Sequence, residues 1–347
     1  MPLRRANAQL LIHAGVMLAS GLFISPAPAA VLGWAAGGDG TIRATADSGA
    51  TWAGQTSVTP FLNYSIDFVD ANNGWAVDSN GFIGHTINGG ASWFRQPSGT
   101  PNELHHVEFV DLNNGWVVGA GGIILRTSNG GTNWSTQASG TANLLWGMDF
   151  VGANNGWAVG ENATIIHTSD GSTWSSQPNP LAGSGLNIIS VSFSDALNGW
   201  SVGNDGYILH TSTGGASWSF QTSGTTRGLN GVDFVDSSNG WAVGTFGTIL
   251  HTSNGGLSWS LQNSGVTNTL QAVDFVNANE GWAVGQWNGT VSAAILHTTD
   301  GGVTWVAQNS GTVNNLFAVS LIVPEPSAFI IATLGLASLG LLARRRK

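Results

Sequence analysis

The chain has 347 residues, of which 42% are hydrophobic and only 8% are charged, with 50 glycines and no cysteine. This composition excludes disulfides and thiolate metal sites, and it is too apolar for an intrinsically disordered chain. Residues 31–323 contain four arginines against 18 acidic residues, a formal charge of −14 (4 − 18), which disfavours nucleic-acid binding.

Residues 1–30 have the pattern of a secretory signal peptide. Arg4 and Arg5 form a basic start, residues 10–24 form an apolar run, and Ala27-Pro28-Ala29 supplies the small residues of a cleavage site. A buried N-terminal helix is the alternative. The pattern predicts that the protein is exported through the inner membrane.

Residues 31–322 contain a repeat that reads as four short strands, and the copy at 232–262 shows it best. Two tryptophans mark each copy, and successive first tryptophans lie 41 or 43 residues apart. The first set is Trp34, Trp75, Trp116, Trp157, Trp200, Trp241 and Trp282, and the second is Trp52, Trp93, Trp134, Trp174, Trp218, Trp259 and Trp305. A period near 40 residues with four strands predicts an all-β, seven-bladed β-propeller.

The two ends of the repeat array are complementary. The chain enters at a second strand around Gly33-Trp34, without a first strand before it. It finishes with residues 316–322, LFAVSLI, which match a first strand and have no blade of their own. We therefore predict that residues 316–322 complete blade one and close the ring, which removes the open strand edges.

The turn before the second tryptophan resembles the Asp-box, S/T-x-D-x-G-x-T/S-W, at 45–52 and 298–305. Asp-boxes are structural hairpins in sialidases and other propellers. The whole repeat, over residues 33–322, resembles that of the photosystem II stability and assembly factor of plants and cyanobacteria. The resemblance implies a lumenal or periplasmic propeller that binds nascent photosystem subunits and has no catalytic role.

A sialidase-like glycan hydrolase is the enzymatic alternative. Retaining sialidases require three arginines around the substrate carboxylate, a tyrosine nucleophile and an acidic partner. The repeats contain four arginines, none of them in a first strand, and the only tyrosines are Tyr64 and Tyr207. We predict no catalytic residues, no cofactor and no metal.

Two positions repeat charged or titratable residues. The third strands carry His85, Arg126, His167, His210, His251 and His297, which lie too far from the axis to share one metal ion and are predicted to pack and hydrogen-bond between blades. The first strands carry Asp67, Glu108, Asp149, Asp233 and Asp274, with Ser192 and Ser320 as exceptions. We expect these acids to bond neighbouring backbone N–H groups or the His/Arg set.

The candidate ligand-binding residues are those that break the repeat. Three residues before the first-strand acid, in ring order, stand Phe317, Tyr64, His105, Trp146, Ile189, Asn230 and Gln271. The first four are predicted to form an aromatic arc at one mouth of the central channel, suited to sugar rings or a hydrophobic peptide. Trp287, in the long 286–293 loop, is a further candidate. The alternative is that the arc only extends the core between blades.

Residues 323–347 read as a sorting segment. Pro324-Glu325-Pro326 is followed by an apolar stretch, 328–343, and by a basic tail from Arg344 to Lys347. This order resembles the PEP-CTERM signal, which implies transient anchoring in the inner membrane and processing by an exosortase-type membrane protease. A plain single-span anchor is the alternative.

Together these features predict an exported, monomeric, non-enzymatic scaffold. It would bind an envelope protein or an exopolysaccharide, and after processing it would be periplasmic, cell-surface or extracellular. An assembly factor for a membrane complex is the second hypothesis.

Overall fold

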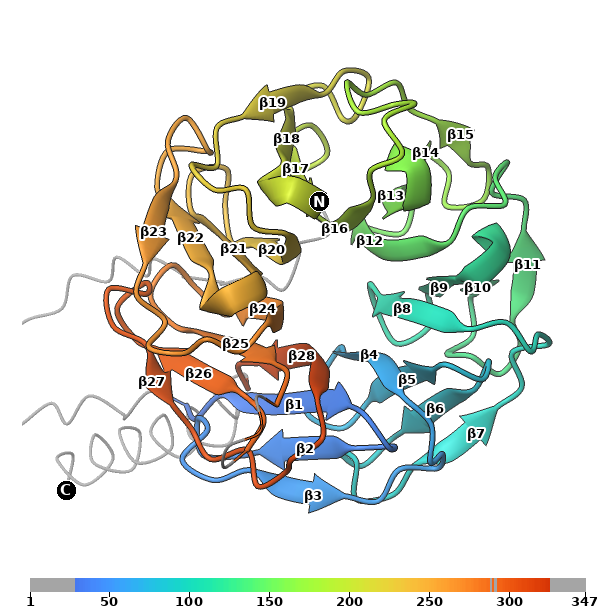
Figure 1. Ribbon diagram of the computed structural model, residues 1–347. Coiled ribbons are helices and arrows are strands. Elements are labelled where there is room, and N and C mark those ends of the chain that lie inside the picture. Colours follow the sequence, from blue (N-terminus) through green and yellow to red (C-terminus); the bar gives the residue numbers. More distant parts are fainter. Residues whose placement is uncertain (1–28, 288, 290–291, 325–347) are drawn as a thin grey trace, which may run out of the picture.

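The computed structural model describes residues 29–287, 289 and 292–324. Seven antiparallel sheets of four strands each stand in a ring around one axis (Figure 1). The predicted seven-bladed β-propeller is confirmed. We number the blades by the order in which their second strands occur, so that blade one contains β28, β1, β2 and β3.

Each blade uses its strands in the same order from the axis outward. The inner strands are β28 (Leu316–Ile322), β4 (Asn63–Phe68), β8 (Leu104–Phe109), β12 (Leu145–Val151), β16 (Ile188–Phe193), β20 (Leu229–Phe234) and β24 (Leu270–Phe275). The second strands are β1 (Leu32–Gly37), β5 (Gly74–Asp78), β9 (Gly115–Gly119), β13 (Asn155–Gly160), β17 (Gly199–Gly203), β21 (Gly240–Gly244) and β25 (Gly281–Gly285).

The outer half of each blade is shorter and more exposed. The third strands are β2 (Ile42–Thr45), β6 (Ile83–Thr86), β10 (Ile124–Thr127), β14 (Ile165–Thr168), β18 (Ile208–Thr211), β22 (Ile249–Thr252) and β26 (Ile295–Thr298). The fourth are β3 (Ala53–Gln55), β7 (Phe94–Gln96), β11 (Ser135–Gln137), β15 (Ser175–Ser176), β19 (Ser219–Gln221), β23 (Ser260–Gln262) and β27 (Val306–Ala307). Short 3₁₀ turns follow four second strands: η1 (Ala120–Gly122), η2 (Glu161–Ala163), η3 (Asn204–Gly206) and η4 (Thr245–Gly247).

The C-terminal strand closes the ring. β28 pairs antiparallel with β1, in a register that runs from Leu32 opposite Ile322 to Gly37 opposite Leu316. Blade one thus combines the first and the last strand of the described chain, and the predicted closure is confirmed. Because the two ends are joined by backbone hydrogen bonds, every inner strand of the described ring is paired.

The first tryptophan of each repeat joins its blade to the next one. In six blades its indole stacks on a phenylalanine of the next inner strand, as Trp241 does on Phe275 with 3.6 Å between the ring centroids. The Trp241 N–H also donates to the carbonyl of Gly301 in the next Asp-box turn, at 3.1 Å. At the closing interface Trp282 instead packs in one cluster with Leu321. These rings, nearly all fully buried, form the core between blades.

A glutamine three residues after the second tryptophan forms a clamp between blades. Gln221 Oε1 accepts from Trp259 Nε1 of the next blade at 3.1 Å, and Gln221 Nε2 donates to the Gly255 carbonyl at 2.9 Å. The same clamp recurs at Gln55, Gln96, Gln137, Gln262 and Gln308. Between blades four and five it does not form, and Trp218 Nε1 is buried there without a partner among the described residues.

The repeated acids of the inner strands bond backbone N–H groups of the next blade, as one of the two predicted alternatives had it. Asp67, Glu108, Asp233 and Asp274 accept from the residue 42 or 47 positions away at 2.8–3.0 Å, and Asp149 does the same with Phe193. Ser192 and Ser320 fill the role with their hydroxyls, at 3.1 and 3.0 Å. Seven equivalent bonds therefore link the inner strands around the ring.

The repeated histidines pack within their own blade. His85, His167, His210, His251 and His297 lie against the tryptophan of the neighbouring second strand, with centroid distances of 3.9–4.9 Å. The sequence predicted packing between blades, but the strand register sets each histidine directly opposite its own tryptophan, as with Trp241 and His251. Arg126, at the same position, does reach the next blade through the Ser172 hydroxyl.

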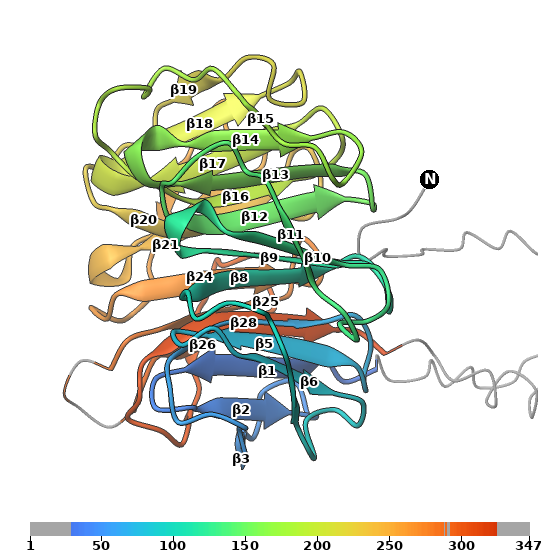
Figure 2. The same ribbon diagram turned by 90° about the vertical axis from the view of Figure 1, so that its right-hand side faces the viewer.

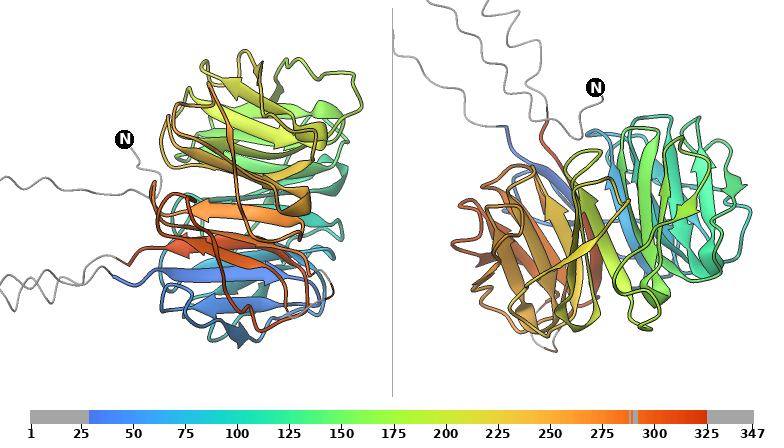
Figure 3. Two further views of the ribbon diagram at one scale, coloured as in Figure 1. Left: turned by 60° about the vertical axis from the view of Figure 1, so that its left-hand side comes forward. Right: turned by 90° about the horizontal axis from the view of Figure 1, so that it is seen from above.

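The ring has two distinct faces, which Figure 2 shows edge-on. We call one the Asp-box face, because it carries the turns between third and fourth strands and those between first and second strands. The other, the linker face, carries the connections between blades and the turns between second and third strands. Since β1 starts and β28 ends at the Asp-box face, both ends of the propeller lie there (Figure 3).

Residues 1–28 of the predicted signal peptide, the apolar stretch 328–343 and two residues of the sorting motif, Glu325 and Pro326, lie outside the described residues. Pro324 is described and follows β28 closely. Within the part of the chain that the structure covers, no helix has the length and apolar character needed to cross a membrane.

Candidate functional site

The predicted aromatic residues lie together on the inner strands of four adjacent blades. Phe317, Tyr64, His105 and Trp146 are each the second residue of β28, β4, β8 and β12. The inner strands surround the axis (Figure 1), and each begins at the linker face, so these four residues belong to that end of their strands. We call these four residues the aromatic arc.

The rings of the aromatic arc contact one another in sequence. Tyr64 stacks on His105, with 4.2 Å between centroids and 14° between the planes. Phe317 lies 5.9 Å from Tyr64, and Trp146 meets His105 edge-on at 4.8 Å. The remaining three blades carry Ile189, Asn230 and Gln271 at this position, so the arc is confined to one side of the ring.

Trp146 brings an unpaired polar group into the arc. The indole N–H of Trp146 is buried and has no hydrogen-bond partner among the described residues. By contrast Asn230, at the same position in blade six, donates its amide to the Leu270 carbonyl of the next blade at 2.8 Å. A buried donor without an acceptor costs about 1–3 kcal/mol, so the polar group at this position is satisfied in blade six and not in blade four.

Two carboxylates border the arc. Glu103 Oε2 lies 3.2 Å from His105 Nε2, and the Glu103 side chain is 51% exposed. Glu161, the first residue of η2, accepts from the Leu144 N–H at 3.1 Å. Burial lowers the pKa of His105, against the opposing effect of its hydrogen bond to Glu103 and the charges of Glu103 and Glu161. Burial, and then the charge of Glu103, raises the pKa of Tyr64.

The fifth candidate, Trp287, lies beside the arc on the linker face. Its backbone N–H donates to Asn315 Oδ1 at 2.9 Å, two residues before Phe317. Its side chain is 42% exposed. The structure thus brings all five sequence-predicted residues to one face, with Trp287 of blade seven beside the connection that leads into β28.

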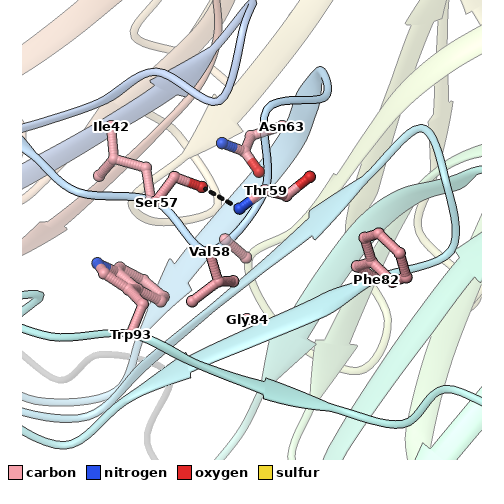
Figure 4. Close-up of a pocket in the computed structure, with 9 residues that line it drawn as sticks. Ile42, Ser57, Val58, Thr59, Asn63, Phe82, Gly84 and Trp93 are labelled. Carbon is pink, nitrogen blue, oxygen red and sulfur yellow. Dashed lines mark hydrogen bonds between the residues drawn. The ribbon is translucent and has the colours of Figure 1, made fainter.

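An enclosed pocket lies elsewhere, between blades one and two (Figure 4). Ile42, Val58, Thr59, Asn63 and Trp93 line much of it. Asn63 stands where the other six inner strands begin with a buried Leu or Ile, and its Nδ2 is buried without a partner among the described residues. The pocket is small, with room for about one water molecule, so we regard it as a packing irregularity of this interface.

Sequence reasoning missed several residues of this face. Glu103 and Glu161 could have been found, because each is the only acidic residue at its position of the seven-fold repeat. Phe246 was also missed: it is 67% exposed and has φ +57° in η4, at the position that Gly121, Asn162 and Asp205 take in η1–η3. Arg227 lies over its ring at 5.5 Å.

Seven four-stranded blades with Asp-box-type turns between their third and fourth strands define a seven-bladed propeller of the Asp-box repeat class. The family model described as photosynthesis system II assembly factor YCF48 matches residues 55–139, 134–223 and 220–310. The chain therefore belongs to this family. A second model, the PEP-CTERM protein-sorting motif, matches residues 323–347 and indicates export and sorting at the cell envelope. No curated protein matches the chain.

Solved structures support the fold. YCF48 bound to D1 peptide is 20% identical, with a TM-score of 0.63 over 79% of this chain and 94% of the other. YCF48 from Cyanidioschyzon merolae is 21% identical, with a TM-score of 0.61 over 76% and 90%. The GH74 xyloglucanase from Xanthomonas campestris is 12% identical, with a TM-score of 0.59 over 84% of this chain and 54% of the enzyme. At these identities the likeness concerns the fold alone.

Proposed function

We propose that the protein is an exported, non-enzymatic scaffold that binds a segment of an envelope protein through the aromatic arc. The observation that carries the proposal is the arc itself: four contacting rings from four adjacent blades, in a propeller whose paired tryptophans and glutamines recur in every blade. Aromatic side chains bring large contact areas at small entropic cost and recur in binding surfaces. Membership in an assembly-factor family, and a similar propeller bound to a peptide, support a protein segment as the ligand.

The positions of the arginines support a non-enzymatic role. Arg43 donates to the Ser310 carbonyl at 2.6 Å, Arg95 lies over Phe82 at 3.2 Å, and Arg126 bonds Ser172. Arg227 stacks over Phe246 in blade six. The four therefore belong to blades one, two, three and six and are engaged locally, so they do not form the three-arginine clamp that a sialidase needs.

An exopolysaccharide is the second candidate ligand, because sugar rings also stack on exposed aromatic faces. The PEP-CTERM segment is compatible with either ligand, and exosortase-type processing would leave the propeller in the periplasm, at the cell surface or outside the cell. Assembly of a membrane complex is one form that binding of a protein segment could take.

The test is retention of partners from the native envelope by the full chain. Tyr64→Ala combined with Trp146→Ala removes two rings of the arc and should abolish retention of the bound protein or glycan. Ile189→Ala combined with Gln271→Ala changes the same column in blades five and seven and should leave retention intact. Equal retention by both double variants would show that the partner binds elsewhere.

A further inference from the structure

The charges around the aromatic arc are all of one sign. Glu103 and Glu161 flank it, and both act on the His105 imidazole at its centre. No arginine among the described residues belongs to an inner strand. Among the described arginines, Arg227 is the one that lies on a connection of the linker face. It belongs to blade six, where its guanidinium lies over Phe246 and donates to the Thr248 hydroxyl at 3.4 Å.

The imidazole does not neutralise these carboxylates at neutral pH. His105 is only 7% exposed, and burial dominates in lowering its pKa, so the ring stays uncharged when it stacks on Tyr64. The centre of the arc is then a set of uncharged aromatic faces next to two carboxylates. Glu103 is half exposed, which leaves it able to pair with a ligand.

This combination suits a cation. The face of an aromatic ring attracts an ammonium or guanidinium group, and an adjacent carboxylate adds an ion pair that is strengthened where water is partly excluded. A neutral sugar would gain nothing from the net charge, and a uronic-acid polymer would be repelled by it. An acidic peptide would be repelled in the same way.

We propose that the aromatic arc binds lysine or arginine side chains of the partner polypeptide, with Tyr64 and Trp146 supplying ring faces and Glu103 and Glu161 supplying the counter-charge. This rests on the proposed function, since it names the chemistry of the segment that the arc binds. Charge complementarity supports it further, because the repeats as a whole carry −14 (4 − 18) between residues 31 and 323.

The test uses the full chain in mild detergent and three fluorescent decapeptides, in which Gly alternates with Lys, Ser or Glu. Binding is followed by anisotropy at about 50 mM and about 500 mM salt. We expect the Lys peptide to bind about tenfold more tightly than the Ser peptide at the lower salt, and the ratio to fall at the higher one. The Glu peptide should bind most weakly.

Charge variants distinguish this inference from non-specific binding of peptides to the protein surface. Glu103→Gln combined with Glu161→Gln keeps the hydrogen-bonding oxygens and should reduce the preference for Lys over Ser to less than about threefold. Asp205→Asn removes a charge from η3 on the same face, in blade five, which contributes no ring to the arc; asparagine already occupies the equivalent left-handed position at Asn162. This control should keep the preference.

Tyr64→Leu separates the inference from the proposed function. If it weakens the Lys and Ser peptides alike, while the glutamine variant leaves the preference unchanged, the arc binds peptide but not through cations, and the inference is wrong. The inference is also wrong if the Ser or Glu peptide binds as tightly as the Lys peptide. If no peptide binds, or if Tyr64→Leu has no effect on any peptide, the proposed peptide-binding role of the arc is itself wrong.

Discussion

The glutamine clamp offers a direct measure of how blades hold one another. In Gln221→Met the side chain keeps its length but loses both polar atoms, so Trp259 Nε1 loses the acceptor that it has at 3.1 Å. The Gly255 carbonyl loses one donor and retains another, Trp200 Nε1, at 3.1 Å. The substitution therefore leaves the partly buried N–H of Trp259 unpaired and removes one bond to the Gly255 carbonyl. We expect it to lower the free energy of unfolding by about 1–3 kcal/mol.

Gln177→Met is the matched control, because Gln177 occupies the same place in blade four without forming the clamp. Its side chain has no hydrogen bond among the described residues, and the Trp218 N–H that it would serve is already unpaired. We expect this substitution to change the free energy of unfolding by less than about 0.5 kcal/mol. Urea unfolding followed by tryptophan fluorescence would measure both. Equal shifts of the two midpoints, or no shift for Gln221→Met, would refute the reasoning.

Three further predictions concern the same fold. Asp233→Ser should lower the free energy of unfolding by less than about 1 kcal/mol, because the Ser192 hydroxyl already accepts the equivalent bond from the Phe234 N–H. Asp233→Val, which leaves the N–H of Phe275 without this acceptor, should lower it by about 1.5–3 kcal/mol. Urea titration of both variants tests the comparison. Asn63→Leu should raise the free energy of unfolding by about 1–2 kcal/mol, because it removes an unpaired buried amide and fills the pocket between blades one and two; a decrease in the melting temperature would contradict this. Burial lowers the pKa of His85 from 6.5 to about 4. The unfolded chain therefore takes up this proton first, so the free energy of unfolding should fall as the pH drops from 6.5 to about 4, with no change above that range. His85→Phe, which can still stack on Trp75, should reduce the slope of this dependence in urea titrations across that range.

The ring could be predicted because its signals are periodic and local. Paired tryptophans 41 or 43 residues apart, with Gly and Asn turns between strands, specify blades, and an unmatched strand at each end specifies the closure. The role of the inner-strand acids could also be predicted as one of two alternatives. Five equivalent carboxylates in a packed ring need hydrogen-bond donors, and backbone N–H groups are the nearest ones.

Contacts between repeats were harder to foresee. The clamp at Gln221 bonds residues that are 34 and 38 positions away and belong to the next blade. The sequence does contain a signal for it, because a glutamine stands three residues after the second tryptophan in all seven repeats. The stacking of histidine on tryptophan was missed for a different reason. It depends on the register of the second and third strands, and a side chain next to Trp241 can only be assigned once that register is known.

Within the site, the arc could be predicted from a run of aromatic residues at one position of the repeat, whereas its flanking carboxylates stand at two other positions whose residues differ from blade to blade. Glu103 lies two residues before His105 on the same chain segment, whereas Glu161 comes from the turn after the next blade's second strand. The rings and the carboxylates therefore lie together in one sector of the linker face, blades two to four. This grouping could not be predicted from any one position of the repeat, because it depends on how neighbouring blades are placed in the ring.

The position of the chain ends indicates how the aromatic arc would be oriented relative to a membrane. β28 ends at Ile322 on the Asp-box face, and only five residues, 323–327, separate it from the apolar stretch predicted to begin at 328. Five extended residues span at most about 18 Å, so anchoring through that stretch would hold the Asp-box face near the membrane. The linker face, with the arc, would then be turned away from the bilayer and towards partners in the envelope. Processing after Pro324 would release the propeller with β28 intact, so the arc and the closed ring would be the same before and after sorting.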